Sequence, residues 1–444
     1  MVGNIKKSTA NIETMFAEGY ALCAEHGVSL PPQELRRSIL QTAHNAYGGA
    51  HADDFAAAYL AFYLFRDMHS RTDDAYPITT LLGDYFFSLF SKFLIPVDSV
   101  PLIDAFSKYL SAQTTETAGG CETEASRIIT SGGKRLRPSL AAICYRMSKR
   151  TCKAATGDSS VPILPLMNML ELMHTTSLIH DDVVDHAQLR RGTKTINATS
   201  GSAFAVQSGD YLLAKAMRHL HYYRGTGINE TLAGVSADMC LGEFQQKRSA
   251  FDLNAQSEYL YLLQIKRKTA SLLAASCYCG ALAGGMNAEK AAALKRFGEY
   301  FGAAFQILDD LLDYEGSPGK AAGQDLRNGI FTLPVLILKD KFPADVRTRL
   351  ISKDKREADI RCIIDYIETT NAPELTWERI IRLCDEACKA LTAFDDCPER
   401  DALIQLANSI TRFSSDKEDR HNEQDISHRN GRGQRKWAGN DSES

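Results

Sequence analysis

The sequence lacks several motifs that mark well-known chemistries. It has no CxxC pair, no HExxH, no GxSxG elbow, no GxxxxGK[ST] loop and no glycine-rich dinucleotide loop after a strand. These absences argue against a zinc ribbon, a zinc protease, a serine hydrolase, a P-loop nucleotidase and a dinucleotide-dependent oxidoreductase. The 11 cysteines are scattered along the chain. We therefore expect reduced cysteines that act as small core residues.

The sequence also lacks a strong charge of either sign. Its formal net charge of -4 at pH 7 offers no whole-surface attraction for nucleic acid or an anionic membrane. We expect no nucleic-acid partner. Residues 1–20 have no apolar signal core and are too acidic for a transit peptide, which favours an intracellular, cytoplasmic protein.

No apolar run is suited to crossing a membrane. Residues 270–285 are rich in Ala, Ser and Gly, which predicts a closely packed buried helix. Residues 81–96 include Asp84 and Lys92 and have helical periodicity. That pattern predicts an amphipathic packing helix.

Helical patterns dominate the rest of the chain, so we predict an all-α protein. Prolines around residues 96–101 mark a junction between an N-terminal helical segment, 1–96, and a main helical domain, 97–412. Residues 413–444 are charged and polar and are expected to form a disordered tail. No internal repeat of fixed period is found.

Two matching acidic clusters are the strongest chemical feature. Each follows an apolar helical run and precedes a glycine-containing turn, and their members are Asp181, Asp182, Asp185, Asp309, Asp310 and Asp313. Carboxylates at a helix C-terminus repel one another and the negative end of the helix dipole. Mg²⁺ prefers such oxygen ligands together with substrate phosphates. We therefore predict a metal-bound diphosphate between the two clusters.

Two basic runs support this prediction. The sequence GGKRLRP places Lys134, Arg135 and Arg137 around a glycine turn, and LRRG places Arg190 and Arg191 after the first cluster. Arginine binds phosphate oxygens with two donors, and lysine binds them as a point charge.

Together these motifs resemble the trans-prenyltransferase, or isoprenyl diphosphate synthase, family. The resemblance covers roughly residues 100–412 and includes GGKRLRP, HDDVVDHAQLRRG, KTA at 268–270, FQILDDLLD and GKAAGQDLRNGIFTLP. It implies a bundle of long helices around a deep central cavity. It also implies three magnesium ions on the six aspartates, holding an allylic diphosphate.

The resemblance further implies roles for individual side chains. The residues that would hold the allylic diphosphate or lie beside it are Arg190, Lys268, Thr269, Gln306 and Lys320. The residues that match the isopentenyl diphosphate pocket are Lys134, Arg137, His174 and Arg191. Released pyrophosphate is the expected proton acceptor, so no dedicated protein base is needed. We expect His180 to be a hydrogen-bonded structural residue.

Product length is expected to depend on the helix before the first cluster. A growing chain would pass Ser177, Thr176 and Met173, and the first two are small. In short-chain members of the family a bulky aromatic residue closes this level. We therefore predict a product of about 30 to 40 carbon atoms, because the helix covers roughly 18 Å from Met169 to Asp181. The alternative is that these side chains only pack the core.

The N-terminal segment has no catalytic motif. Its stretch TTLLGDYFFSLFSKFL resembles the non-catalytic subunit of two-component heptaprenyl diphosphate synthases. The main domain resembles the catalytic subunit, notably at GEFQQKR and IKRKTASLLAASC. This suggests a fusion in which residues 1–96 stabilise the synthase or set product length. An accessory hairpin without regulatory effect is the alternative.

Three other functions would leave different marks in the sequence. A synthase with a product of about 15 to 20 carbon atoms would have a closed tunnel, and a non-catalytic partner subunit would have lost its aspartates. A terpene cyclase would have Asn, Ser and Glu in its second metal motif instead of a second DDxxD. We expect a homodimer whose product enters a quinone side chain, such as that of menaquinone, and passes to the membrane.

Overall fold

The structure, a computed structural model, describes residues 16–25, 28–47, 52–69, 71, 76–94, 123–124, 126–129, 132–152, 160–316 and 321–412. Within these ranges almost every element is a helix, which confirms the all-α prediction. The described strands are only β1 (Leu189–Arg190) and β2 (Thr193–Lys194), which pair antiparallel. The predicted tail, 413–444, lies outside the described residues, as does most of the stretch between 95 and 131.

The helices form an N-terminal group and a larger bundle. The N-terminal group is α2 (Ala17–Glu25), α3 (Gln33–Tyr47), α4 (Ala52–His69) and α5 (Tyr76–Leu94). The first part of the bundle is α8 (Leu136–Cys152), α9 (Ile163–Val184), α10 (Ile196–Ser200), α11 (Ser202–Met217), the 3₁₀ turn η1 (Leu220–Tyr223) and α12 (Ile228–Ser249).

The second part of the bundle carries the other acidic cluster. It begins with α13 (Glu258–Ile265), a π-helix at Lys266–Ala270, α14 (Ser271–Ala283) and α15 (Ala288–Asp313). It continues with α16 (Gln324–Arg327), α17 (Leu333–Ile337), α18 (Ala344–Ile351), α19 (Glu357–Glu368), α20 (Ala372–Ala390) and the 3₁₀ turn η3 (Leu391–Ala393). A last helical stretch covers 398–412.

Small residues let the central helices pack closely. A Cβ on Gly280 of α14 would lie 2.3 Å from the Ala141 carbonyl oxygen of α8, and a Cβ on Gly298 of α15 would lie 2.6 Å from the Ala274 Cα of α14. Such distances are too short for any side chain. Nearly every residue of α14 is buried, which confirms the prediction of a closely packed buried helix.

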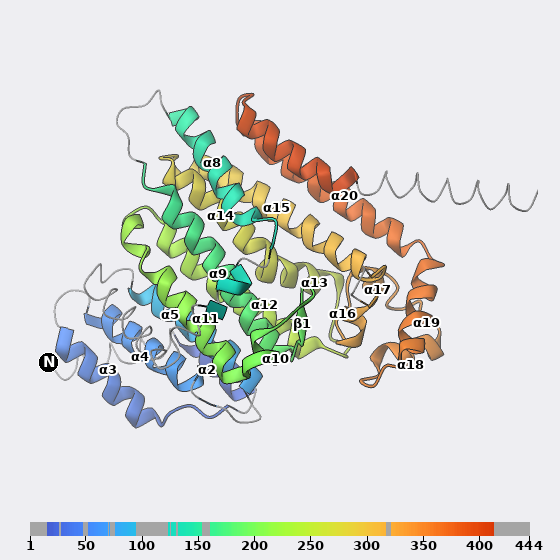
Figure 1. Ribbon diagram of the computed structural model, residues 1–444, viewed down its shortest axis with the longest axis horizontal. Helices are drawn as coiled ribbons and strands as arrows, with labels where there is room; N and C mark the ends of the chain where they lie inside the picture. Colours follow the sequence, from blue (N-terminus) through green and yellow to red (C-terminus); the bar gives the residue numbers. More distant parts are fainter. Residues whose placement is uncertain are drawn as a thin grey trace, which may run out of the picture.

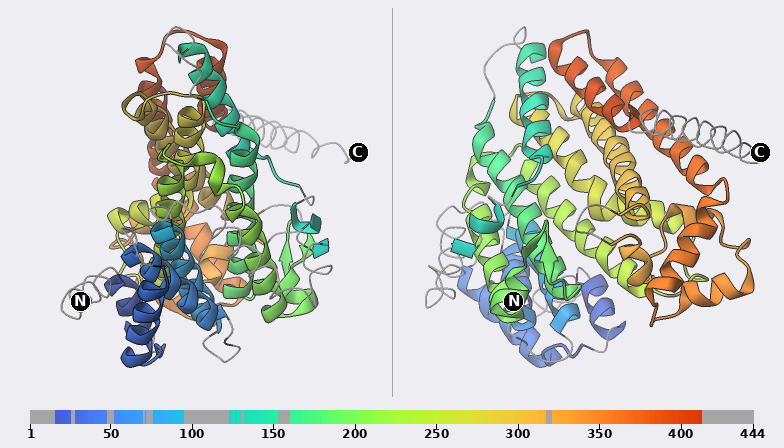
Figure 2. Two further views of the ribbon diagram at one scale, coloured as in Figure 1. Left: turned by 90° about the vertical axis from the view of Figure 1, so that its left-hand side faces the viewer. Right: turned by 45° about the vertical axis from the view of Figure 1, so that its right-hand side comes forward.

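The N-terminal helices share a hydrophobic core with the bundle. Side chains of α4 and α5 belong to one buried cluster with those of α9, α11, α12 and α14. Figures 1 and 2 show the blue helices at one end of the bundle, where α5 packs against α9 and α12. Helix α5 buries most of its side chains, which confirms the predicted packing helix. No helix in the described part of the chain is long and apolar enough to cross a membrane.

Candidate active site

The first acidic cluster lies at the C-terminal end of α9. Asp182 is only 3% exposed and accepts a 2.8 Å hydrogen bond from Arg190 Nε on β1. Asp185 forms an ion pair with Lys247 of α12. Burial raises the pKa of Asp181, Lys268 opposes this rise, and the like charges of Glu243 and Asp185 add to it. The protein alone therefore disfavours the charged form of Asp181.

The second cluster lies at the C-terminal end of α15. Asp310 accepts hydrogen bonds from the Tyr261 hydroxyl at 2.6 Å and from Gln306 Nε2 at 2.7 Å. Burial nevertheless raises its pKa. Asp313 accepts a 2.9 Å bond from the Asp325 backbone N–H, and Asp309 is exposed.

The π-helix connects the two clusters. Thr269 donates a 2.7 Å hydrogen bond to Gln306 Oε1 of α15, one turn before Asp310. Lys268 points the other way, toward α12, where it forms an ion pair with Glu243 and donates a 3.1 Å bond to Gln246 Oε1. π-helices are rare and often occur at functional sites, because the wider turn re-aims its side chains. Here Lys268 contacts Glu243 near the first cluster, and the next residue, Thr269, contacts Gln306 near the second.

The charge of Lys268 is maintained by its neighbours. Burial alone would lower its pKa, but the carboxylates of Glu243, Asp181 and Asp185 outweigh burial and raise it. A permanently charged ammonium group beside Asp181 suits an anionic ligand at this point. Glu243 had not been selected from the sequence as a site residue. The motif GEFQQKR contains it, so that motif was the available signal.

A cationic hollow opens beside the first cluster. The hollow is lined by Ile128, Gly132, Arg135, Glu171, His174, Thr175, Leu178, Arg190, Arg191 and Thr193. Arg191 donates a 2.6 Å bond to the Gly132 carbonyl, and Arg135 forms an ion pair with Glu171. Arg135 and Arg191 have left-handed backbone conformations, with φ of 47° and 51°, which non-glycine residues adopt mainly at special positions.

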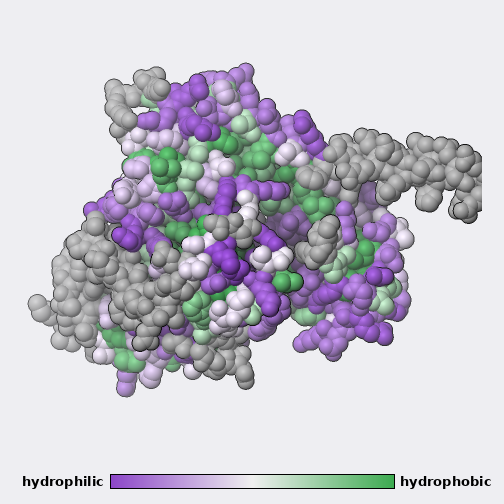
Figure 3. Space-filling model, in the orientation of Figure 1, coloured by the Kyte–Doolittle hydropathy of each residue, from purple (hydrophilic) through white to green (hydrophobic). Residues whose placement is uncertain are grey.

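The histidine in this hollow is neutral. Burial and four arginines, led by Arg137, lower the pKa of His174 to about 2. The pKa of Arg137 is itself lowered to about 10 by burial, with Glu171 opposing, and its Nε is buried without a hydrogen-bond partner. An anion bound here would supply the missing acceptor. Figure 3, drawn from the same side as Figure 1, shows hydrophilic side chains gathered at the middle of the molecule, over α9.

The structure brings most of the expected residues together, with differences. Arg135, rather than Lys134 or Arg137, lines the hollow. The Lys134 ammonium lies 6.0 Å from the ring centre of Phe305 on α15, so the basic turn still faces the helix of the second cluster. Lys320 lies outside the described residues.

The residues expected to set product length have defined surroundings. Thr176 is 3% exposed, and its hydroxyl lies 3.4 Å from the Gly209 carbonyl of α11. Ser177 donates back to the His174 carbonyl at 2.9 Å, and Met173 packs against the main core. Their role in product length stays a prediction. The structural role expected for His180 is confirmed, because both of its ring nitrogens lie within hydrogen-bond distance of oxygen atoms.

Known proteins with similar sequences or structures are consistent with this site. Residues 121–367 match the Polyprenyl synthetase family. The chain is 34% identical over 281 residues to heptaprenyl diphosphate synthase component 2 of Geobacillus stearothermophilus, covering 63% of this chain and 84% of the relative. It is 33% identical over 309 residues to decaprenyl-diphosphate synthase subunit 1 of Schizosaccharomyces pombe, covering 63% and 80%.

A solved structure shares the fold. It is a polyprenyl synthase from Caulobacter crescentus complexed with calcium and isoprenyl diphosphate, with a TM-score of 0.61 and 32% identity, covering 70% of this chain and 98% of that one. The all-α bundle of long helices that the resemblance implied, known as the isoprenoid synthase fold, is therefore confirmed. With more than half of its length matched to the family, the chain belongs to the polyprenyl synthetases.

Proposed function

We propose that this chain joins isopentenyl diphosphate to an allylic diphosphate and repeats the step to make a long-chain polyprenyl diphosphate. The observation that carries the proposal is the π-helix, whose Lys268 and Thr269 connect the surroundings of two acidic helix ends. Beside the first cluster lies the arginine-lined hollow. Two anionic substrates therefore have two adjacent positions.

The allylic diphosphate would lie between the acidic clusters. Lys268 and Arg190 would contact its oxygens directly, because both cations already face the first cluster. Thr269 and Gln306 form a hydrogen-bonded pair beside the second cluster, and they would orient the same group. The expected contact from Lys320 is part of this proposal.

The carboxylates suit magnesium. The donor set consists of aspartate oxygens, and the raised pKa values of Asp181 and Asp310 show that burial disfavours their negative charge. A divalent cation would remove that penalty. The six aspartates of the two clusters would hold Mg²⁺, which when bound stabilises negative charge on a departing diphosphate.

Isopentenyl diphosphate would occupy the arginine-lined hollow. Arg135 and Arg191 line it, and Arg137 lies near enough to His174 to lower its pKa. His174 is neutral there and can donate or accept one hydrogen bond without adding charge. Lys134, beside Phe305, would close the side that faces α15.

The chemistry is electrophilic alkylation. The C–O bond to the allylic diphosphate breaks, and the leaving diphosphate takes the electron pair. The isopentenyl double bond then forms the new C–C bond, and the proton lost from the adjacent carbon passes to the released diphosphate. Lys268 and Arg190 would stabilise the charge that develops on the leaving group.

The finer features are part of the same proposal. We propose a product of about 30 to 40 carbon atoms, because Thr176 and Ser177 leave room along the roughly 18 Å of α9 from Met169 to Asp181. Use of the product in a quinone side chain, its passage to a membrane, a cytoplasmic location and pairing of two chains follow from the sequence analysis as expectations.

The test is an assay of the purified chain with labelled isopentenyl diphosphate, farnesyl diphosphate and Mg²⁺, followed by sizing of the products. Changing Asp181→Asn or Asp310→Asn should abolish elongation, and chelation of Mg²⁺ should do the same reversibly. Asp345→Asn, at an exposed position of α18, is the matched control and should leave turnover unchanged. Full turnover in both cluster variants would refute the proposal.

A further inference from the structure

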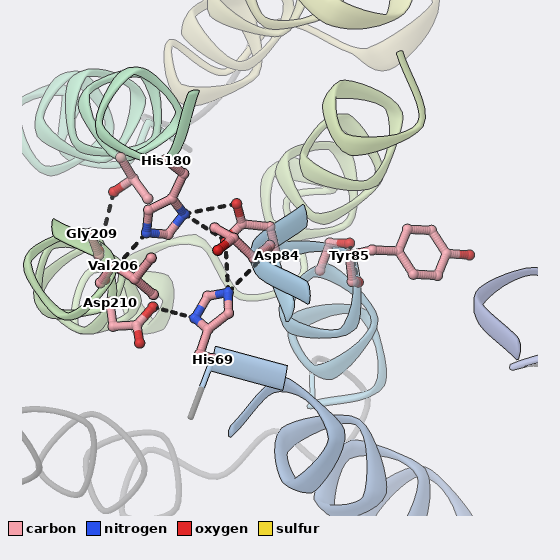
Figure 4. A network of polar contacts seen from close by, with 10 residues as sticks. His69, Asp84, Tyr85, His180, Val206, Gly209 and Asp210 are labelled. Atoms are coloured by element: carbon pink, nitrogen blue, oxygen red, sulfur yellow. Dashed lines mark hydrogen bonds and ion pairs between the residues drawn. The ribbon is translucent and has the colours of Figure 1, made fainter. Parts of the chain in front are cut away.

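The N-terminal hairpin α4–α5 and the bundle hairpin α9–α11 exchange polar contacts. His180 of α9 lies 2.8 Å from an Asp84 carboxylate oxygen on α5, measured from Nδ1. In the reverse direction, His69 at the end of α4 lies 2.7 Å from an Asp210 oxygen on α11, again from Nδ1. Each hairpin thus contributes one histidine and one aspartate, and each histidine crosses to the other hairpin's aspartate (Figure 4).

The glycine before each aspartate lies against a histidine ring in both hairpins. A Cβ on Gly83 would lie 2.0 Å from the ring of His69, and a Cβ on Gly209 would lie 2.0 Å from the ring of His180. Each glycine therefore allows the histidine of its own hairpin to lie close against the neighbouring helix.

The second ring nitrogens are also equivalent. His69 Nε2 lies 3.0 Å from the Thr80 carbonyl, three residues before Gly83, and His180 Nε2 lies 3.3 Å from the Val206 carbonyl, three residues before Gly209. The two rings meet edge to face, with centres 5.4 Å apart and an interplanar angle of 86°. Equivalent residues that contact each other lie beside an approximate two-fold axis.

The sequence contains traces of this relationship. The tripeptide Gly-Asp-Tyr occurs at 83–85 and at 209–211. The stretch between histidine and glycine is longer in the bundle hairpin because it contains the acidic cluster and the β1–β2 loop, so no fixed period exists. Ser70 and Arg71 follow His69, whereas Asp181 and Asp182 follow His180. The N-terminal hairpin therefore lacks the first two carboxylates.

A metal site is the competing interpretation of this cluster. The side-chain ligand atoms of His69, Asp84 and His180 all lie within 4.8 Å of one another. However, each of the four ring nitrogens faces an oxygen acceptor. Nitrogens that donate N–H bonds have no lone pair for a metal. Two histidines facing two carboxylates and two backbone carbonyls form a partly buried network without a metal ion.

We infer that α4–α5 is an internal counterpart of α9–α11 and occupies, within one chain, the face on which a second copy of α9–α11 would otherwise dock. In a two-fold dimer, residue i of one copy contacts residue j of the other and the reverse. Because α9–α11 itself carries both His180 and Asp210, two bare copies would present the same crossed pairs. The family match begins at residue 121, after α5, so the hairpin is an addition to the shared bundle. The chain supplies its own partner at this face.

The test compares four full-length chains by sedimentation velocity, circular dichroism and limited proteolysis. His69→Gln with Asp84→Asn loosens the hairpin and leaves the bundle face intact. Adding Asp210→Asn to that pair removes the aspartate that a second copy would need. Glu34→Gln, at an exposed carboxylate of α3, is the control for loss of one charge in the N-terminal segment.

The expected result has three parts. The double variant keeps its helical content, its hairpin becomes sensitive to protease, and a species with twice the mass of the unmodified chain's species appears. The triple variant loses that species, and the control sediments like the unmodified chain. The inference is overturned if the double variant's hairpin stays protected, if it is released without any gain in mass, or if the gain persists in the triple variant.

If the double variant misfolds, exchanging the two residues of one crossed pair still tests the inference. His69→Asp with Asp210→His reverses one crossed pair and should restore a wild-type mass and protease pattern, whereas Asp210→His alone should not. Equal behaviour of the exchanged and single variants would also overturn the inference.

Discussion

At the scale of single residues, Glu243 links the site to its strongest cation. Its side chain is 4% exposed and forms an ion pair with Lys268. Hydrogen bonds to charged groups contribute about 1.5–3 kcal/mol, so we expect Glu243→Gln to reduce kcat/KM for the allylic substrate by roughly 10- to 100-fold. Steady-state kinetics with each substrate varied in turn will measure this.

The control for this prediction is on the same helix. Glu230→Gln changes an exposed carboxylate of α12 and should have no effect. A role in positioning Lys268 requires the loss to fall on the allylic diphosphate more than on isopentenyl diphosphate. An equal loss for both substrates would indicate a general structural defect instead.

Thr176 tests the expected path of the product. We predict that Thr176→Phe shortens the product by at least one isoprene unit, because a large ring at this buried level of α9 would block the lipid. Chromatographic sizing of the product measures it. Ser177→Ala, which adds no bulk, should leave the length unchanged, and a normal product from Thr176→Phe would exclude this residue from the path.

At the scale of helices, the position of the second cluster depends on how closely α15 packs against α14. We expect Gly298→Val to destabilise the protein by about 1–3 kcal/mol, because its side chain would meet the Ala274 backbone. Displacement of α15 would also move Asp309 and Asp310, so activity should fall with stability. Thermal unfolding and Mg²⁺-dependent turnover are the measurements.

The matched control is the same substitution in another helix. Gly234 of α12 is exposed and has open space where a Cβ would lie. Gly234→Val should therefore leave stability unchanged or raise it by a few tenths of a kcal/mol, by about the difference in helix propensity. Similar losses at both positions would show that close packing is not the cause.

At the scale of the whole molecule, docking of the N-terminal helices should depend on pH. Burial alone would lower the pKa of His69, but Asp210 and Asp84 outweigh burial and the opposing charge of His180, and the pKa lies above its ordinary value of 6.5. A raised pKa means that the charged form stabilises the folded state. This contribution is complete below about pH 6.5 and is lost as the pH rises through the folded pKa.

Thermal unfolding between pH 6 and pH 10 should therefore show a steeper loss of stability in the unmodified chain than in His69→Gln. The variant should already be less stable at the low end of the range, because it lacks the charge there. Parallel curves for the two proteins would contradict this assignment of the charge.

Local spacing in the sequence was sufficient to determine the helices and the chemistry at their ends. Apolar periodicity defined α9 and α15, and the aspartates of both clusters lie in or directly after the last turns of these helices. The basic runs also lie close to the first cluster, as expected. These features depend on residues near one another in the chain, whose geometry a helix or a tight turn sets directly.

Only the tertiary structure decided which distant groups meet. It selected Glu243 as the partner of Lys268, Arg135 rather than Lys134 for the hollow, and a crossed histidine network between hairpins far apart in the chain. Sequence spacing does not predict such pairs, because they arise from the packing of helices against one another. The effect of a glycine or a buried charge depends on the residue it contacts in that packing. Residues close to it in the sequence do not reveal which residue that is.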